Sequence, residues 1–390
     1  MSATPDPAPR TSLRELALLF LRLGATAFGG PAAHIAIMED EVVRRRRWLT
    51  EERFLDLLGA TNLIPGPNST EMAIHIGWVR RRWAGLVVAG AAFIVPAMLM
   101  TGALGWAYVR YGSIPTAVWF FYGVKPVILA VVVQAIWGLA PKAAQTTQLR
   151  LLAVVTATLA ALGVNELVLL FGAGVAAVAA ARIPRPPESG SGIVRQLVPI
   201  VPLAAGAVAP SAVTVSGLFL IFLKIGSVLF GSGYVLLAFL RADLVERLGW
   251  LTESQLIDAV AVGQVTPGPV FTTATFIGYV LAGPSGALAA TAGIFLPAFV
   301  FVALSGPLVP RLRASKAAGA FLDGVNVASL ALMTVVTFQL GHAALVDAPT
   351  VALAVGAALV LLRFRPNASW LVLGGAAAGW ALHALRVASG

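Results

Sequence analysis

The sequence predicts an all-α polytopic membrane protein made of two homologous halves. Three observations support this prediction: the composition, an internal repeat, and proline–glycine breaks inside apolar segments. Of the 390 residues, 58% are hydrophobic and only 11% are charged, whereas soluble globular domains carry about 25% charged residues. A chain with so few polar side chains cannot cover a water-facing surface, so its solvent must be lipid.

The apolar segments are continuous and long enough to cross a bilayer. Segments 84–109, 115–140 and 285–306 exceed or match the roughly 20 residues that a spanning helix needs, and they lack the alternation of barrel strands. The net charge of +10 fits the basic loops that orient membrane proteins, so we predict no nucleic-acid partner. The chain has no cysteine, which excludes thiolate chemistry, and we predict neither a metal nor a cofactor.

An internal repeat with an offset of 202 residues organises the chain. "FLRLGATAFGG" at 20–30 matches "FLKIGSVLFGS" at 222–232, and "WLTEERFLD" at 48–56 matches "WLTESQLID" at 250–258. After a one-residue slip, Gly123-Val124 matches Gly324-Val325. We therefore predict four parts: a disordered tail (1–11), a first transmembrane repeat (12–181), a linker (182–211) and a second transmembrane repeat (212–388).

The distribution of positive charge predicts that the repeat is inverted. In the first half, the loops at Arg44–Arg47 and Arg80–Arg82 are strongly basic, while their second-half counterparts are balanced or uncharged. The imbalance reverses at Arg311–Lys316, whose first-half counterpart has one arginine. If basic loops lie in the cytoplasm, equivalent loops face opposite sides of the membrane. Inverted repeats are typical of secondary transporters.

The same charge pattern predicts a re-entrant hairpin over 53–79, because the loops on both sides of it are basic. Each arm has about a dozen residues and rises only about 18 Å as a helix. Pro65, Gly66 and Pro67 would form the tip, since proline interrupts a helix; a proline kink in a full span is the alternative. For 13–37 we expect a full crossing, with about ten spans in all, the alternative being a second hairpin broken at Gly29-Gly30.

The helix breaks predict a central anion site. A helix start exposes unpaired N–H groups and a partial positive charge. Hydroxyl and amide groups follow the breaks, which would lie together near the midplane of an inverted repeat. The predicted N-cap and first-turn residues of the returning helix are Asn68, Ser69, Thr70 and Glu71, and we predict that the first three bind the anion together with Gly29, Gly30 and Thr272. The other break residues are Pro31 in the first half and Pro267, Gly268 and Pro269 in the second.

Charged side chains inside apolar segments are costly and usually functional. Arg22 and Lys224 occupy the same repeat position, so we predict that both contact an anion; snorkelling to an interface is the alternative. Lys125 is predicted as a counter-charge, or as the structural partner of an acid. Glu71 is the candidate proton-coupling carboxylate, or a helix cap. Asp56 and Asp258 repeat in register, and we expect a structural role for both.

The stretch "FGGPAAHIAIMEDEVVRRRRWLTEERFLDLLGATNLIPGPNSTEMAIHIGW" resembles the signature of the chromate ion transporter (CHR) family. The resemblance covers nearly the whole chain, because long members of that family are similarly made of two homologous halves. It implies an inner-membrane carrier that exports chromate, is driven by the proton motive force and is inhibited by sulfate. The second half departs from the signature at Gly231-Ser232-Gly233 and lacks Asn-Ser-Thr-Glu after its Pro-Gly-Pro.

Three functional interpretations remain at this point. A proton-coupled exporter of a tetrahedral oxyanion fits the inverted repeat, the broken helices and the resemblance. A passive anion channel would need the same site without coupling. A membrane-embedded enzyme is disfavoured, because the chain contains neither an HExxH nor a GxSxG motif. The expected partners are the oxyanion, the lipid bilayer and a second copy of the chain in a homodimer.

Overall fold

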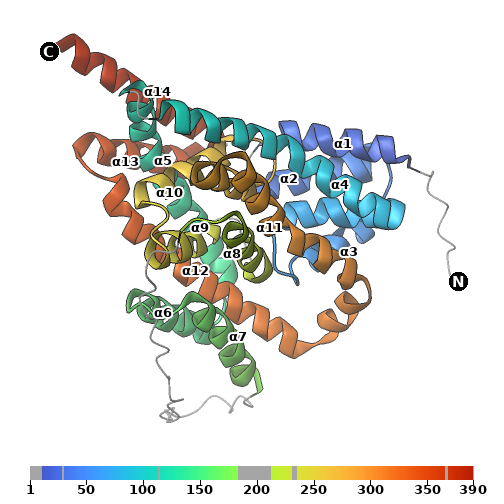
Figure 1. Ribbon diagram of the computed structural model, residues 1–390. Coiled ribbons are helices and arrows are strands. Elements are labelled where there is room, and N and C mark those ends of the chain that lie inside the picture. Colours follow the sequence, from blue (N-terminus) through green and yellow to red (C-terminus); the bar gives the residue numbers. More distant parts are fainter. Residues whose placement is uncertain are drawn as a thin grey trace, which may run out of the picture.

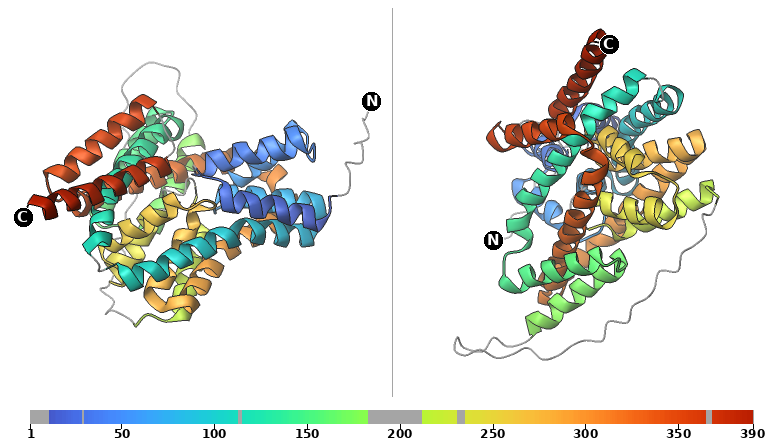
Figure 2. Two further views of the ribbon diagram at one scale, coloured as in Figure 1. Left: turned by 90° about the horizontal axis from the view of Figure 1, so that it is seen from above. Right: turned by 90° about the vertical axis from the view of Figure 1, so that its left-hand side faces the viewer.

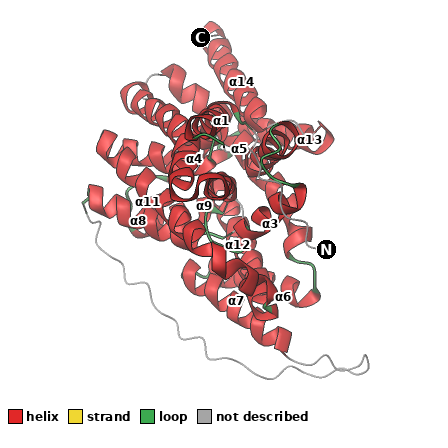
Figure 3. Ribbon diagram, turned by 90° about the vertical axis from the view of Figure 1, so that its right-hand side faces the viewer, coloured by secondary structure: helices red, strands yellow, loops and turns green. Residues whose placement is uncertain are grey.

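The protein is helical throughout the part of the chain that the computed structural model describes, residues 11–28, 30–112, 115–182, 212–230, 235–364 and 368–389. Figure 3 shows helices and connecting loops and no strand in these ranges. The predicted all-α fold is therefore confirmed. Residues 1–10 of the predicted tail, 183–211 of the predicted linker, and Gly29 lie outside the described residues.

The order of helices repeats between the two halves (Figure 1). The first half contains α1 (Leu13–Thr26), α2 (Gly30–Glu39), η1 (Asp40–Arg45), α3 (Glu51–Thr61), α4 (Asn68–Tyr111), α5 (Pro115–Ala143), α6 (Thr147–Ala161) and α7 (Glu166–Arg182). The second contains α8 (Val215–Val228), α9 (Leu236–Leu240), η2 (Arg241–Arg247), α10 (Glu253–Val265), η3 (Val270–Thr272), α11 (Thr273–Ala314), α12 (Lys316–Ala344), α13 (Ala348–Phe364) and α14 (Ala368–Ser389).

The local signals that start these helices repeat as well. Ser12 caps α1 and Thr214 caps α8, and each hydroxyl accepts a backbone N–H three residues on. Thr50 and Thr252 cap α3 and α10 in the same way. A hydroxyl at the N-cap satisfies one of the orphan donors of the first turn. Both halves therefore begin their short helices at equivalent residues.

The halves are interleaved by reciprocal packing. Helix α1 packs on α4, and its counterpart α8 packs on α11; α4 and α11 also pack on each other. Helices α13 and α14 pack on α5 of the first half, while α6 and α7 pack on α12 of the second. Figures 1 and 2 show α6 and α7 beside α12, and α14 beside α5. This exchange of partners is the two-fold relation that an inverted repeat requires.

The segment that follows residue 12 folds back on itself rather than running straight across. Arg22 on α1 contacts Glu41 in η1, and Arg80 donates both to Thr11 Oγ1 (2.8 Å) and to the carbonyl of Trp48 (3.0 Å). Residues 11 and 48 thus lie side by side, although α1 alone rises about 20 Å. The expected full crossing by 13–37 is wrong, because the break near Gly30 turns the chain, and the hairpin alternative is the structure found.

The segment 53–79 also leaves and returns, as predicted. Residues 48 and 80 are joined by the Arg80 hydrogen bond, and the break between α3 and α4 falls at 62–67. Helix α4 in turn comprises two helices joined by a tight turn at Arg81 and Arg82, where the φ angle of Arg82 is 51°. Gly77 and Gly85 face each other across this turn, and small residues allow such close approach. In α11, Gly278 and Gly286 face each other in the same way around Ala282 and Gly283.

Five helical segments in the described part of the chain are long and apolar enough to cross a membrane: Asn68–Tyr111, Val118–Ala143, Val270–Ser305, Lys316–Ala344 and Ala368–Leu385. Shorter apolar helices, α6, α7, α8 and α13, pack around them. Large apolar side chains such as Trp137, Phe338 and Trp370 are about 75% exposed, which is expected where lipid replaces water. The chain is a polytopic membrane protein.

Candidate functional site

Each Pro-Gly-Pro turn is docked on the end of a helix from the other half. Gly66 N donates to the carbonyl of Leu229, which ends α8 (2.8 Å), and Gly268 N donates to the carbonyl of Ala27, which ends α1 (2.9 Å). Both glycines have positive φ angles, 142° and 86°, a region that glycine enters without strain. The internal repeat alone does not predict these two hydrogen bonds, because they form only when the two halves are interleaved.

The helices that start after these turns have no side-chain cap. Pro67 is the N-cap of α4 and Pro269 that of η3, and neither position has a side-chain hydrogen bond. The expected capping by Asn68 is wrong, because the helix starts at Asn68 itself, one residue earlier than that role requires; Asn68 Nδ2 donates instead to Asn62 Oδ1 (2.9 Å). The first-turn N–H groups are therefore left without a competing side chain, as an anion site needs.

A cavity of about 620 Å³ lies between the two halves at these helix starts. Gly30 and Pro31 at the start of α2, Asn68 and Ser69 at the start of α4, and Val270 line it. Three of the predicted binding residues, Gly30, Asn68 and Ser69, are thus brought to one cavity. The remaining lining residues are Ile35, Thr61, Asn62, Ile64, Pro67, Gln134, Ala135, Gly138, Leu139, Lys142, Ala143, Val235, Phe271, Asn326, Ser329 and Leu330.

The polar groups of this cavity are mostly neutral. Lys142 is the one charged side chain among its lining residues. Ser329 on α12 is 2% exposed, and its hydroxyl has no hydrogen-bond partner among the described residues. Because a buried polar group normally has a partner, Ser329 is a candidate to contact a ligand. The arrangement of uncapped helix starts, hydroxyls and amides can hold a small anion.

Three of the predicted residues do not line the cavity and lie behind the residues that do. Thr70 and Glu71 are fully buried, and the Thr70 hydroxyl and both Glu71 carboxyl oxygens have no hydrogen-bond partner among the described residues. The Glu71 carboxyl lies directly against the α-carbon of Gly66, where a side chain would collide with it. Thr272 donates to the carbonyl of Pro269 (2.8 Å). Glu71 is therefore at the tip of the first Pro-Gly-Pro turn but not in the cavity.

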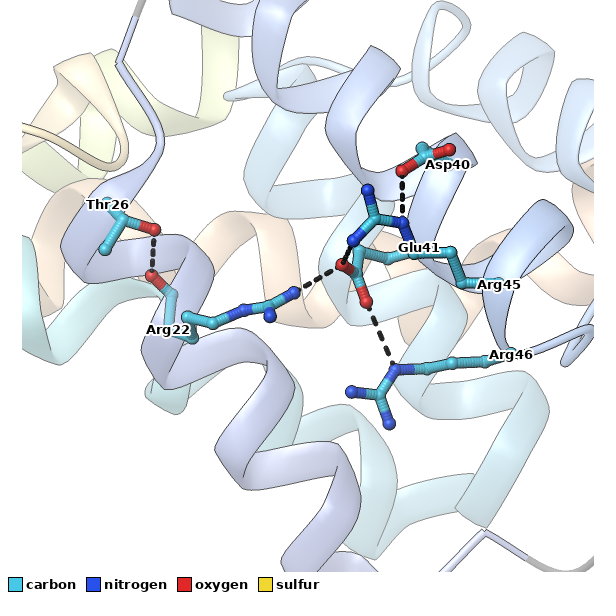
Figure 4. A network of polar contacts seen from close by, with 6 residues as sticks. All are labelled: Arg22, Thr26, Asp40, Glu41, Arg45 and Arg46. Carbon is cyan, nitrogen blue, oxygen red and sulfur yellow. Dashed lines mark hydrogen bonds and ion pairs between the residues drawn. The ribbon is translucent and has the colours of Figure 1, made fainter.

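The two repeated cations are neutralised by two repeated acids. Arg22 Nη2 lies 2.5 Å from Glu41 Oε1 (Figure 4), and Lys224 Nζ lies 2.6 Å from Asp243 Oδ2 and 3.7 Å from Glu166 Oε1. Each acid follows its cation by 19 residues. Neither Arg22 nor Lys224 lines the cavity, so they brace the hairpins that surround it.

Figure 4 shows that Glu41 also receives Arg45 and Arg46, both at 3.3 Å. Burial acts to raise the pKa of the Glu41 carboxyl, but the hydrogen bond and charge of Arg22, together with Arg46 and Arg45, lower the pKa below its ordinary value. The carboxylate therefore stays ionised and holds the base of the first hairpin together.

Lys125 joins three helices in a buried cluster. Its Nζ lies 3.3 Å from Asp258 Oδ1 and 2.5 Å from Ser254 Oγ, both on α10. Tyr108 on α4 donates to Asp258 Oδ2 (2.9 Å). Asp56, the repeat equivalent of Asp258, is instead more than half exposed and lies 4.0 Å from Arg53. The repeat equivalent of Lys125 is the uncharged Asn326, so this lysine–aspartate pair belongs to one half.

Sequence reasoning missed four polar residues that line the cavity: Ser329, Gln134, Asn326 and Lys142. Each is a single polar residue in an apolar helix. Such residues carry no motif, and only the packing of α5 and α12 on the helix breaks shows their place.

Comparison with known proteins finds chromate transport proteins that are similar over most of this chain. The chain is 34% identical over 373 residues to a chromate transport protein of Cupriavidus metallidurans, covering 95% of this chain and 93% of that protein. It is 33% identical over 398 residues to a chromate transport protein of Pseudomonas aeruginosa (97% and 94%), and 31% identical over 346 residues to a probable chromate transport protein of Synechococcus elongatus (88% of each). No solved structure matches the fold.

Residues 14–178 and 216–380 each match the family model of the chromate transporter, so the match falls once on each half. Together the two matches cover most of the chain. With the interleaved repeats and the relatives above, they show that this chain is a member of the chromate transporter family.

Proposed function

We propose that this chain exports chromate from the cytoplasm across the inner membrane, driven by the proton motive force, with sulfate as a competitor. The observation that carries this proposal is the cavity of about 620 Å³ at the start of α2 and at the uncapped starts of α4 and η3, in a chain of the chromate transporter family. Export of chromate would lower its cytoplasmic level and confer resistance.

The substrate contacts would come from the backbone N–H groups at Gly30 and Asn68 and from the hydroxyls of Ser69 and Ser329, all of which line the cavity. Partial charges at helix starts favour an anion, and a helix start binds sulfate-like groups without a full positive charge. Chromate and sulfate are both tetrahedral dianions of similar size, so this site would accept both. Four further residues lie outside the cavity lining and would act on the anion indirectly, through their position and charge: Thr70, Thr272, Arg22 and Lys224.

Glu71 is the proposed proton-carrying group. Its carboxyl is fully buried and has no partner among the described residues, and an ionised carboxylate without a partner costs several kcal/mol or more to bury. It lies against Gly66, whose N–H holds the end of α8. A proton leaving Glu71 would therefore be linked to movement of the Pro-Gly-Pro turn that borders the cavity.

The cavity is proposed to face the cytoplasm in this structure. Lys142 lines it and opens the basic stretch Lys142–Arg150, which we predict to be cytoplasmic because basic loops usually lie on that side. The state captured is then the one that loads substrate for export.

The test is chromate accumulation in everted vesicles energised by respiration, with and without an uncoupler and with excess sulfate. Uptake that requires energisation and falls with sulfate is expected. Equal flux with and without the uncoupler would replace the exporter by a passive anion channel. Absence of chromate flux in vesicles that contain the inserted protein would refute chromate as the substrate.

A further inference from the structure

The internal repeat relates the open cavity to a second region, its closed image, where the equivalent residues enclose almost no volume. Under the one-residue-slipped repeat that pairs Gly123 with Gly324, the cavity residues Asn326, Ser329 and Leu330 correspond to Lys125, Ile128 and Leu129. The cavity residues Leu139 and Ala143 correspond to Leu340 and Ala344. All five corresponding residues line one small pocket of about 10 Å³.

A second small pocket also consists of residues equivalent to those of the open cavity. Asn62 and Asn68 of the open cavity correspond to Gln264 and Val270, with the offset of 202, and both line another pocket of about 10 Å³. Leu237, the counterpart of Ile35, lines both small pockets. One copy of the passage thus has a volume of about 620 Å³, and the other is reduced to voids of about one water molecule.

The closed copy contains an ion pair that the open copy lacks. Lys125 lines the closed pocket and is held by Asp258 at 3.3 Å and by Ser254 at 2.5 Å, while Tyr108 fixes the second oxygen of Asp258 at 2.9 Å. These contacts tie α5 and α4 to α10, the first arm of the second hairpin. At the equivalent place in the open cavity stands Asn326, which carries no charge.

We infer that the chain has a second substrate passage, the two-fold image of the open cavity, which the Lys125–Asp258 pair holds shut, and that Lys125 faces the oxyanion once this passage opens. The inference rests on the proposed oxyanion transport and names the gate of that transport. When α10 moves away from α5, the pair separates and the ammonium group faces a widened passage that water can enter. An anion replaces Asp258 as its partner there, so a positive charge does not remain unpaired in the membrane interior.

The inference explains why the buried pair is present in one half alone. A buried ion pair contributes little net stability, but loss of one partner is strongly unfavourable. Asp258→Asn would leave Lys125 without its carboxylate in a closed, nearly dry pocket, so opening of the passage to water becomes the favoured state. The two passages are alternatives, because residues of α5 and α12 line both of them, and opening one should close the other.

The absence of cysteine from the chain allows a direct test by single-cysteine labelling. Ser329→Cys reports on the open cavity, and Ile128→Cys on its closed image. Each is treated with the membrane-impermeant thiol reagent MTSES in everted and in right-side-out vesicles, without substrate. We expect Ser329→Cys to react from the cytoplasmic side and Ile128→Cys to be protected on both sides.

Adding Asp258→Asn should raise the labelling rate of Ile128→Cys by about tenfold or more, from the external side only, and lower that of Ser329→Cys by a similar factor. The exchanged pair Lys125→Asp with Asp258→Lys should restore protection of Ile128→Cys. Continued protection in the inserted Asp258→Asn protein would overturn the inference, as would labelling of both cysteines from the same side. Labelling needs no chromate, so the result stands whether or not chromate proves to be the substrate.

Discussion

Replacement of Glu71 by glutamine should uncouple transport from the proton gradient while leaving the fold intact. Both carboxyl oxygens of Glu71 lack a partner among the described residues, and the side chain is fully buried. An amide of nearly the same shape breaks no observed hydrogen bond, so the change in the free energy of unfolding should stay within about 1 kcal/mol. Glutamine cannot release or take up a proton, so any step that needs this exchange should stop.

Glu71→Ala separates packing from proton transfer. This change removes a methylene and the carboxyl group, a volume of about 50 Å³. A cavity of that size costs about 1.2 kcal/mol at about 24 cal/mol per Å³, and the lost methylene costs about 0.8 kcal/mol. The free energy of unfolding should therefore fall by about 2 kcal/mol. We therefore expect Glu71→Ala to lower the melting temperature measurably and Glu71→Gln to leave it nearly unchanged. Both should lose energised accumulation.

The assay compares two modes of transport in vesicles. Accumulation of chromate driven by a pH gradient should fall by at least about tenfold in Glu71→Gln, whereas exchange of external labelled chromate for internal chromate should continue, since exchange needs no net proton movement. Glu52→Gln, on the exposed base of the same hairpin, is the matched control and should accumulate normally. Full pH-driven accumulation by Glu71→Gln would refute the coupling role.

Three further predictions concern the cavity, the hairpin and the ion-pair cluster. Ser329→Ala should weaken apparent chromate affinity about 10- to 100-fold in transport kinetics, as expected for one hydrogen bond to a charged ligand, while Ser305→Ala, whose hydroxyl bonds Val302, should not change it. Gly77→Ala should lower the melting temperature because its methyl group would overlap the Gly85 carbonyl, whereas Gly172→Ala, with open space around it, should keep or raise the melting temperature; equal effects would contradict the close packing. The pKa of Glu41 is lowered in the folded protein, so the stability it contributes is present above its ordinary value of about 4.3 and lost as the pH falls through the lowered one. Melting temperatures from pH 6 to about pH 3 should therefore fall less steeply for Glu41→Gln than for the unaltered chain, and parallel curves would count against this assignment.

Much of the architecture could be predicted from the sequence, because it follows from signals that act locally. The helix breaks at Pro65 and Pro67, the return of the chain at Arg80 and the repeat of the capping threonines all depend on a few neighbouring residues. The cavity position of Asn68 and Ser69 follows from the same breaks. The breaks themselves needed no knowledge of how the halves pack, whereas the cavity lies between the halves and depends on it.

The errors and omissions arise where distant segments meet. Residues 13–37 are apolar enough to suggest a span, and contacts between distant residues, such as that of Arg22 with Glu41, show that the chain turns back. That contact had a sequence signal, since Glu41 and Asp243 are both acidic at equivalent repeat positions, 19 residues after the two cations. The partner of Lys125 had none, because Asp258 lies 133 residues away and the repeat equivalent of Lys125 is the uncharged Asn326.

The reciprocal hydrogen bonds of the Pro-Gly-Pro turns have a consequence for biosynthesis. Gly66 binds the carbonyl of Leu229, which leaves the ribosome 163 residues later. At about 5 to 20 residues per second this delay is roughly 8 to 33 s. During that interval the tip of the first hairpin has no Leu229 carbonyl to bind. The first half therefore has to be shielded by the insertion machinery or by lipid headgroups until α8 is made, and truncated chains that end before Leu229 should be substrates for membrane proteases.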